Sequence, residues 1–220
     1  MTQHAIYNPP AHEGLELIYA DPYLLAVGKP SGLLSVPGRG ADKADSLSTR
    51  VQAEYPDALV AHRLDRDTSG LVIFPRGADM HRRLSLMFEK REVEKSYVAV
   101  LLGKLQPEQG VVDQPLLVDW PNRPQHRVDL ENGKPAQTRY QTLSYDAPSN
   151  TSRVALEPVT GRTHQLRVHM AFLGHPIKGD TLYGGDADGL TGRLLLHAHT
   201  LSFIHPVTGA SLNLHSELPF

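Results

Sequence analysis

The sequence predicts an α+β fold built on a mainly antiparallel sheet. Strand-like runs outnumber helical ones, and the helices are inserted irregularly instead of following each strand. Turn residues are dense, with 18 Gly and 17 Pro among 220 residues, so many short elements are expected. A doubly wound fold would need strands and helices to alternate, which disfavours it. The length suits one compact domain, residues 1–220, with a short N-terminal extension at 1–14.

Eight runs rich in aliphatic, branched and aromatic residues predict the strands. They lie at Leu15–Tyr19, Tyr23–Val27, Leu59–Leu64, Leu71–Phe74, Tyr97–Leu102, Thr138–Leu143, Arg153–Leu156 and Leu194–Phe203. Their short length agrees with the density of turn residues.

The first of three predicted helices covers Leu47–Tyr55. Either Asp45 or Ser46 supplies its N-cap, because short polar side chains accept the hydrogen bonds of the first turn. Pro56 ends the helix, since proline cannot continue it.

The other two predicted helices follow from apolar residues at helical spacing. One covers Ala78–Lys90, where an apolar stripe lies opposite basic residues. The other opens near Thr163 and ends at Gly174, in the favoured position after a helix C-terminus. On this last helix His164 and Arg167 share a face, three residues apart.

Composition excludes several kinds of chemistry. Without cysteine there can be no disulfide, thiolate nucleophile, cysteine-ligated zinc or iron–sulfur cluster, and a reducing cytoplasm is the expected compartment. The N-terminus lacks the basic and apolar segments of a secretion signal, and no run of about twenty apolar residues could span a bilayer. We therefore expect no membrane partner.

Net charge gives no support for nucleic-acid binding. Lys and Arg number 22 against 24 Asp and Glu, a formal charge of -2, whereas nucleic-acid-binding proteins usually carry a basic surface. The stretch Gly161–Lys178 differs, because it holds Arg162, Arg167, Lys178 and three histidines but no acidic residue. It predicts an anion-facing surface, although on charge alone an ordinary solvated face explains it equally well.

Two polar segments are candidates for chemistry. Residues 62–70, HRLDRDTSG, lie between two predicted strands, where loops commonly present catalytic groups. Residues 161–167, GRTHQLR, open the third helix, a placement that suits anions. A solvated turn with local ion pairs would explain the first segment alone, but the second segment weakens that interpretation.

These segments resemble the signature of the RluA family of pseudouridine synthases, which detach uracil from its ribose in RNA and rejoin it through carbon. The resemblance rests on His62-Arg63-Leu64-Asp65 followed by Thr68-Ser69-Gly70, and on Lys29-Pro30-Ser31-Gly32-Leu33, Lys95-Ser96-Tyr97, Gly161 to His169 and Leu194 to Ala198, in matching order. It covers nearly the whole chain. It implies the pseudouridine synthase fold, an extended mixed sheet with flanking helices and loops and a central catalytic cleft.

Three further features bear on this resemblance. The stretch Asp119–Pro124 is similar to the RluA branch of the family, and no S4-type RNA-binding domain fits before Leu15. Gly28 departs from the family, which usually has Asn at this position. Because residues 29–32 keep the family pattern, we interpret Gly28 as a tolerated loop change. The resemblance thus implies a single catalytic domain.

Three catalytic residues are implied by the resemblance. Asp65 is the carboxylate that acts as nucleophile or base, and an aspartate is already ionised at neutral pH. Arg167 is similar to the family arginine that pairs with this carboxylate, which keeps it ionised and fixes its rotamer. Tyr97 matches the active-site tyrosine, whose ring stacks on the target base and whose hydroxyl lies where the C5 proton departs. For such a tyrosine, core packing is the alternative.

The resemblance also implies the contacts with RNA. Arg63 matches a residue that enters the RNA in place of the extruded uridine, a surface arginine being the alternative. The expected substrate-binding and RNA-binding residues are His62, Arg63, Lys29, Arg162, His164, Gln165 and Leu196. The expected partners are stem-loops of 23S ribosomal RNA and of the tRNA anticodon arm, recognised by a monomer that needs no cofactor.

Two rival functions remain open from the residues alone. A nucleoside or RNA N-glycosidase would use Asp65 and Asp67 as its two carboxylates and would release free uracil. Two residues apart on an extended segment, however, these side chains would point in opposite directions. A non-catalytic RNA-binding module would keep Arg63 and the basic stretch but would not need Asp65.

Histidines and a glycine-rich loop raise the question of a metal. A zinc site would need at least three ligands held by partner residues, so neither the histidines of 161–178 nor the pair His197 and His199 is expected to form one. The loop Gly184–Gly189 lacks the ligand spacing and terminal Glu of an EF-hand, and we interpret it as a mobile loop.

Overall fold

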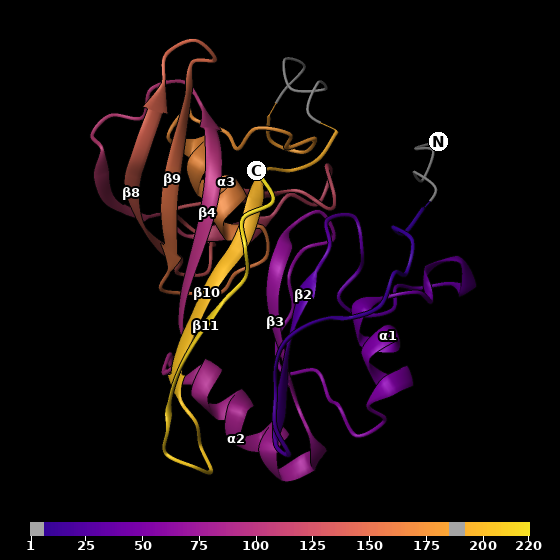
Figure 1. Ribbon diagram of the computed structural model, residues 1–220. Helices are drawn as coiled ribbons and strands as arrows, with labels where there is room; N and C mark the ends of the chain where they lie inside the picture. Colours follow the sequence, from indigo (N-terminus) through magenta and orange to yellow (C-terminus); the bar gives the residue numbers. More distant parts are fainter. Residues whose placement is uncertain (1–6, 185–191) are drawn as a thin grey trace. The chain divides into compact units, whose positions relative to one another are not determined.

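The computed structural model describes residues 7–184 and 192–220 and divides the chain into two compact units. The first unit contains the chain up to Glu92 together with Phe203–Ser216, and the second contains Val93–Ser202 and Glu217–Phe220. The chain passes from the second unit to the first within strand β10 (Leu196–Ile204). Figure 1 labels several of the elements of each unit.

Antiparallel strands form the sheet of the first unit. β1 (Glu16–Ala20) pairs with β2 (Leu24–Lys29), and β2 pairs with β3 (Ser69–Pro75). Both β2 and β3 are buried along their whole length, because their sequences are mainly apolar. Helix α2 (Gly77–Glu89) packs against β3, and β11 (Ser211–His215) contacts β1.

Helix α1 (Leu47–Glu54) begins where the sequence predicts, and the structure identifies Ser46 as the N-cap. The Thr49 amide donates to Ser46 Oγ at 3.3 Å, and the Ser46 amide donates to Thr49 Oγ1 at 2.9 Å. This reciprocal capping box satisfies two amides of the first turn. A short 3-10 helix, η1 (Ala41–Lys43), precedes it.

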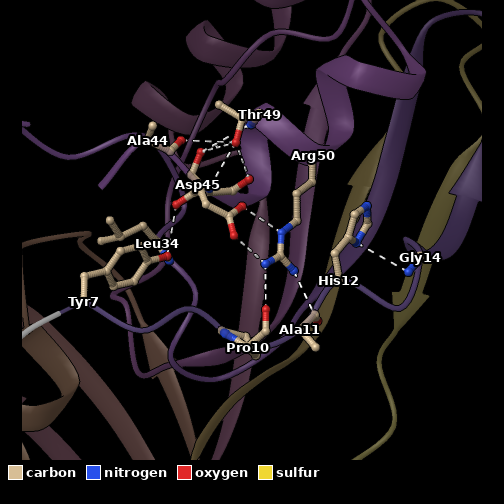
Figure 2. A network of polar contacts seen from close by, with 11 residues as sticks. Tyr7, Pro10, Ala11, His12, Gly14, Leu34, Ala44, Asp45, Thr49 and Arg50 are labelled. Atoms are coloured by element: carbon tan, nitrogen blue, oxygen red, sulfur yellow. Dashed lines mark hydrogen bonds and ion pairs between the residues drawn. The ribbon is translucent and has the colours of Figure 1, made fainter. Parts of the chain in front are cut away.

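Arg50 fastens the segment before β1 to helix α1 (Figure 2). Its Nε and Nη2 atoms donate to the two carboxylate oxygens of Asp45 at 2.8 and 2.7 Å, and Nη2 also donates to the Pro10 carbonyl at 2.6 Å. The hydrogen bond from Arg50 lowers the pKa of Asp45. Tyr7 extends this network, since its hydroxyl donates to the Asp45 carbonyl and accepts from the Leu34 amide, each at 3.0 Å.

The sheet of the second unit has the strand order β10-β4-β9-β8-β5, with antiparallel neighbours. Its strands are β4 (Glu94–Leu102), β5 (Gln109–Asp113), β8 (Gln137–Asp146) and β9 (Thr151–Pro158), together with β10. A separate hairpin consists of β6 (Leu116–Val118) and β7 (His126–Val128). Helix α3 (Gln165–Phe172) packs against β7, β8 and β9, so it lies between the hairpin and the sheet.

Helix α3 ends as predicted but begins slightly later than predicted. Gly174 has φ 81°, and its amide donates to the Ala171 carbonyl at 2.9 Å while the His175 amide donates to Met170 at 3.0 Å. These two bonds form a Schellman motif, which explains the glycine. At the other end, His164 and not Thr163 is the N-cap residue, with φ 55° in the left-handed region.

The α+β class and the mainly antiparallel sheet are confirmed, but one predicted strand is wrong. The run Leu59–Leu64 is irregular, with one isolated bridge beside it between Ala58 and Arg76. Two side chains explain this outcome. The His62 Nε2 atom accepts the Ile73 amide of β3 at 2.9 Å, and both backbone groups of Leu64 bond to Ser35 Oγ, so these three backbone groups are not available for strand pairing.

The gaps in the predictions are short elements of three to five residues each. The sequence does not predict η1, β5, β6, β7 or β11. Of the predicted loop Gly184–Gly189, all but Gly184 lies outside the described residues. No helix in the described parts of the chain has both the length and the apolar character needed to cross a bilayer.

Candidate active site

The predicted carboxylate, Asp65, is half-buried on an irregular loop of the first unit. The residue before it is fixed by a buried serine. Ser35 Oγ donates to the Leu64 carbonyl at 2.7 Å and accepts the Leu64 amide at 3.0 Å. One hydroxyl therefore satisfies both backbone groups next to Asp65, and the loop cannot move without breaking two buried hydrogen bonds.

The residues after Asp65 are fixed by the Lys29 segment. The buried ammonium of Lys29 donates to the carbonyls of Leu33 and Arg66 at 2.6 and 2.7 Å. Ser31 Oγ donates to the Asp67 carbonyl at 2.7 Å. Segment 29–35 thus forms a hydrogen-bonded cradle for loop 64–67, so two segments that carry the resemblance are in direct contact. The predicted contact of Lys29 with RNA stays a prediction.

His62 and Arg63 have different surroundings. The His62 Nε2 atom accepts the Ile73 amide, and its ring packs on Phe88 with centroids 4.5 Å apart. These contacts hold the loop against β3 and α2, and an RNA contact of His62 stays a prediction. Arg63 is exposed and has no hydrogen bond or ion pair with any described residue. An arginine in this state can reach a ligand without breaking a bond within the protein.

Asp67 is paired locally. Its carboxylate accepts from the Arg66 Nε and Nη2 atoms at 2.8 and 3.1 Å. This arrangement agrees with a structural role for Asp67.

The structure corrects the placement of Gly28. It lies within β2, opposite Glu16 of β1 and Leu71 of β3, and not in a loop. A Cβ atom built on Gly28 would clash with the carboxylate of Glu16. That carboxylate is the end of a flexible, exposed side chain and can move aside, so the clash does not by itself require glycine at this position.

Tyr97 and Leu196 lie on neighbouring strands of the second unit. Tyr97 in β4 is opposite Leu156 of β9 and Ala198 of β10, and it is half-buried against the apolar core. Leu196 belongs to that core and is 3% exposed. These positions fit packing for both residues. Their predicted roles at the substrate stay predictions.

Arg167 lies on α3 with its side chain only 3% exposed. Its Nε and Nη2 atoms donate to the two carboxylate oxygens of Asp180, each at 2.7 Å, and Asp180 is fully buried. A bidentate pair of this kind is strong and fixes the guanidinium plane. The prediction that Arg167 pairs with Asp65 concerns residues of two units and stays a prediction.

Two neighbours of Arg167 on α3 are also buried and hydrogen-bonded. Gln165 donates to the Gln137 carbonyl and Thr138 Oγ1, and accepts from Thr160 Oγ1 at 2.6 Å. His169 bonds through Nδ1 to Thr138 Oγ1 and through Nε2 to the Gln114 carbonyl, each at 2.9 Å. Burial lowers the pKa of His169, an effect that the hydrogen bond to the carbonyl partly offsets.

The interpretation of Gly161–Lys178 as one anion-facing surface is therefore wrong. Arg167 and His169 point into the protein, because α3 is covered on nearly every side by the sheet and the β6–β7 hairpin. Arg162 remains exposed, with Nε on the Pro135 carbonyl at 3.0 Å. The hydrogen bonds of the Gln165 side chain hold the loop before α3 in place. RNA contacts of Arg162 and Gln165 stay predictions.

A tyrosine that the sequence analysis missed joins these groups. The Tyr183 ring lies 5.2 Å from the Arg167 guanidinium carbon. Its hydroxyl accepts the His126 amide and bonds to His164 Nδ1, each at 2.8 Å. The His164 ring therefore has a fixed orientation beside α3, and its predicted contact with RNA stays a prediction.

The predicted family stretch Asp119–Pro124 forms the tip of the β6–β7 hairpin. Trp120 is 64% exposed there, and the Arg123 guanidinium carbon lies 4.5 Å from its ring centroid. An exposed aromatic ring covered by a guanidinium is a surface on which unpaired bases can stack.

Sequence reasoning missed three residues that hold these groups: Ser35, Asp180 and Tyr183. A single serine gives no signal, and Asp180 lies just beyond the stretch that draws attention by its charge. No group of three or more His, Asp or Glu side chains within residues 7–184 and 192–220 is arranged to hold a metal ion. The two nitrogens of His169 are both bonded to protein oxygens.

Comparison with known proteins bears directly on this arrangement. The family model described as RNA pseudouridylate synthase matches residues 23–172. The chain is 48% identical to the dual-specificity RNA pseudouridine synthase RluA of Escherichia coli K12, over 97% of this chain and 98% of that protein. It is 49% identical to the protein of the same name from Salmonella typhi, over 94% of each chain.

Solved structures give the same result. Human RNA Pseudouridylate Synthase Domain Containing 1 superposes with a TM-score of 0.81 at 29% identity, over 97% of this chain and 87% of that one. Human RNA Pseudouridylate Synthase Domain Containing 4 superposes with a TM-score of 0.75 at 26% identity, over 92% and 88%. The predicted fold is therefore confirmed.

Proposed function

This chain belongs to the RNA pseudouridylate synthase family, and from that premise we propose that it converts uridines in stem-loops of both 23S ribosomal RNA and tRNA to pseudouridine. The observation that carries the proposal is the similarity to a dual-specificity enzyme over almost the full length of both chains. The stretch Asp119–Pro124 supports it, since an exposed hairpin tip with Trp120 and Arg123 suits the splayed bases of an RNA loop.

The reaction rearranges bonds without gaining or losing atoms. The bond from C1′ to N1 of uracil breaks, the base turns, a bond from C1′ to C5 forms, and the C5 proton is lost while N1 regains one. We assign Asp65 the role of the reacting carboxylate. It can attack C1′, attack C6 of the base or remove a proton from the sugar. A loop with its backbone fixed on both sides suits each role, because positioning errors of about 1 Å are costly in catalysis.

The other predicted residues have supporting roles in this proposal. Arg167 pairs with Asp65 and fixes its rotamer, and Tyr97 stacks on the target base and receives or relays the C5 proton. Arg63 takes the place of the extruded uridine, while His62, Lys29, Arg162, His164, Gln165 and Leu196 line or support the RNA site. We propose that these residues act together on one uridine and that residues 1–220 form a single catalytic domain.

Two properties of the whole protein complete the proposal. It acts as a monomer in the bacterial cytoplasm, where a chain without cysteine has no need of an oxidising compartment. Light scattering at the concentration of the activity assay tests the first property, and a dimer would contradict it. Fractionation of cells that express the tagged protein tests the second.

The deciding experiment offers the purified protein two RNAs, an isolated anticodon stem-loop and protein-free 23S ribosomal RNA. Chemical derivatisation and primer extension then locate pseudouridine. We expect both RNAs to be modified, with no free uracil and with full activity after prolonged chelation. Modification of one RNA alone would disprove the dual range. Release of uracil would indicate an N-glycosidase, tight binding without conversion would indicate a binding module, and activity lost to EDTA and restored by zinc would indicate a metal enzyme.

A further inference from the structure

The side chain of Arg167 needs a partner because it is buried. A guanidinium removed from water costs several kcal/mol unless a well-placed opposite charge compensates it. The carboxylate of Asp180 provides this charge. Its two oxygens accept hydrogen bonds from Nε and Nη2, along one edge of the guanidinium, and both distances are 2.7 Å. Since the group is planar, this contact fixes the direction in which its other end, Nη1 with Nη2, points.

Asp180 is itself held by backbone groups. Its Oδ1 atom accepts the amides of Leu182 and Tyr183 at 2.9 and 3.1 Å, in addition to the Arg167 bond. The Asp180 amide donates to the carbonyl of Ile177, which is bridged to Leu101 of β4. The position of the carboxylate is therefore fixed by the backbone and the sheet of the second unit. Because it does not depend on Arg167, Asp180 can determine where the guanidinium lies.

Tyr183 supplies a second fixed contact. Its ring faces the guanidinium at 5.2 Å, and its hydroxyl is held by the His126 amide and by His164. The ring also packs with the small apolar cluster around Val168. A carboxylate on one edge and an aromatic ring on one face leave the guanidinium a single orientation.

We infer that Asp180 is the positioning residue for Arg167 in uridine isomerisation, with Tyr183 as its second support. This inference rests on the proposed role of Arg167 as the partner of Asp65. Asp180 touches neither the RNA nor the reacting atoms in this proposal. It acts by keeping one end of the guanidinium occupied, so that the other end serves the catalytic carboxylate.

The test replaces Asp180 by Asn, which keeps the shape but removes the charge and one acceptor oxygen. Single-turnover rates at saturating anticodon stem-loop should fall about 10- to 100-fold, as expected for a displaced catalytic group. The Kd for the RNA should stay within about twofold, because a purely positional defect acts on the chemical step. A folded Asp180→Asn protein with the wild-type rate, or with its whole loss in Kd, would overturn the inference.

Asp129 provides a matched control. It also accepts two backbone amides, those of Glu131 and Asn132, and it also binds an arginine, Arg127, at 3.1 Å. Unlike Arg167, Arg127 is 53% exposed. Asp129→Asn should therefore disturb a similar turn and leave the single-turnover rate unchanged. An equal loss of rate in both variants would show that the effect of Asp180 is general, and would overturn the inference.

A second variant covers the case in which Asp180→Asn does not fold. Tyr183→Leu removes the ring beside the guanidinium at a half-buried position and keeps the Asp180 pair. We expect a smaller loss of the single-turnover rate at saturating RNA, about 3- to 10-fold. Only the rate is compared for this variant, because the lost hydroxyl also held His164, a proposed RNA contact. A wild-type rate for Tyr183→Leu would count against the inference whether or not Asp180→Asn folds.

Two further measurements separate this inference from the proposed function. If the wild-type protein forms no pseudouridine, the proposed function fails. If Arg167→Lys, which cannot form the fork, turns over at the wild-type rate, the proposed role of Arg167 fails. If Arg167→Lys is slow while Asp180→Asn is not, the inference on Asp180 alone fails.

Discussion

The two units hold their predicted catalytic charges in different ways. In the first unit the loop of Asp65 is fixed through its backbone, by Ser35 on one side and Lys29 on the other, and the carboxylate itself is half-buried. In the second unit Arg167 is fixed through its head group, by the buried carboxylate of Asp180. A group that must react needs its own atoms accessible, whereas a group that only stabilises a charge can be paired and buried.

Asp65→Asn gives the most direct test of this comparison, and the largest expected effect. The backbone bonds of the loop belong to Leu64 and Arg66, so the exchange of one side-chain oxygen for nitrogen should leave them intact. We expect pseudouridine formation to fall on the order of 10³-fold or more, with Tm and RNA affinity nearly unchanged. Single-turnover kinetics, thermal unfolding and filter binding measure the three quantities. A comparable rate for Asp65→Asn would remove Asp65 from the mechanism.

Arg63→Ala tests the contrast between an exposed and a buried arginine. Because Arg63 has no partner among the described residues, its removal should leave Tm unchanged. Extrusion of a paired base costs a few kcal/mol, so turnover of a structured stem-loop should fall on the order of 10- to 100-fold, and turnover of an unstructured strand much less. Arg82→Ala, at another exposed arginine, should affect neither substrate. Equal losses on both substrates would show that Arg63 does not assist extrusion.

Ser35→Ala tests whether backbone support matters for catalysis, and Ser152 offers a close match. Ser152 Oγ donates to the Gly103 carbonyl and accepts the Leu105 amide, just as Ser35 bonds to both groups of Leu64. Each Ala variant leaves a buried amide unsatisfied and should lose about 1–3 kcal/mol of unfolding free energy. We expect only Ser35→Ala to lower the single-turnover rate as well, about tenfold. Equal rates in both variants would show that the Ser35 cradle is purely structural.

These arrangements show what a sequence can reveal about the fold. Continuous apolar runs such as Leu71–Phe74 predict buried strands correctly, because burial on both faces requires that composition. The similar run Leu59–Leu64 fails, since the side chains of His62 and Ser35 take the hydrogen bonds that a strand would use. Strands such as β7 are missed because they contain few residues and are mostly not buried. Such a strand leaves no periodic pattern of apolar residues in the sequence.

In the candidate site, too, some residues can be identified from the sequence and others cannot. Asp65, Arg63 and Arg167 stand in local motifs, so their sequence neighbours identify them. Asp180 is thirteen residues from Arg167 along the chain, and only the packing of its loop on β4 brings the two together. Burial is equally invisible in the sequence, because the helical spacing around Arg167 shows one apolar face whereas the folded helix is covered on nearly every side.

The smallest expected effect concerns pH, and it sharpens the comparison between the units. In the first unit, burial alone would raise the pKa of Asp21, but hydrogen bonds from the Tyr23 and Leu24 amides and from Tyr19 bring it below its ordinary value. A carboxylate with a lowered pKa contributes stability that is present above its unfolded pKa of about 3.9 and is lost as pH falls through the folded value. Protonation of Asp21 should therefore not change the stability of the first unit between pH 7.5 and 5.5.

In the second unit, protonation of His169 should change the stability within this pH range. Burial lowers its pKa below the ordinary value of 6.5, so at pH values between the folded and unfolded pKa only the unfolded chain binds the proton. The contribution of His169 to the free energy of unfolding is thus fully present above about pH 6.5 and is lost as pH falls.

We expect the Tm of wild-type protein to fall from pH 7.5 to 5.5, and amides of α3 to exchange faster. His169→Gln, which can still donate to the Gln114 carbonyl, should show a flatter Tm profile, whereas His12→Gln at an exposed position should keep the wild-type slope. Parallel profiles for wild type and His169→Gln would show that the buried histidine does not make the second unit sensitive to mild acid.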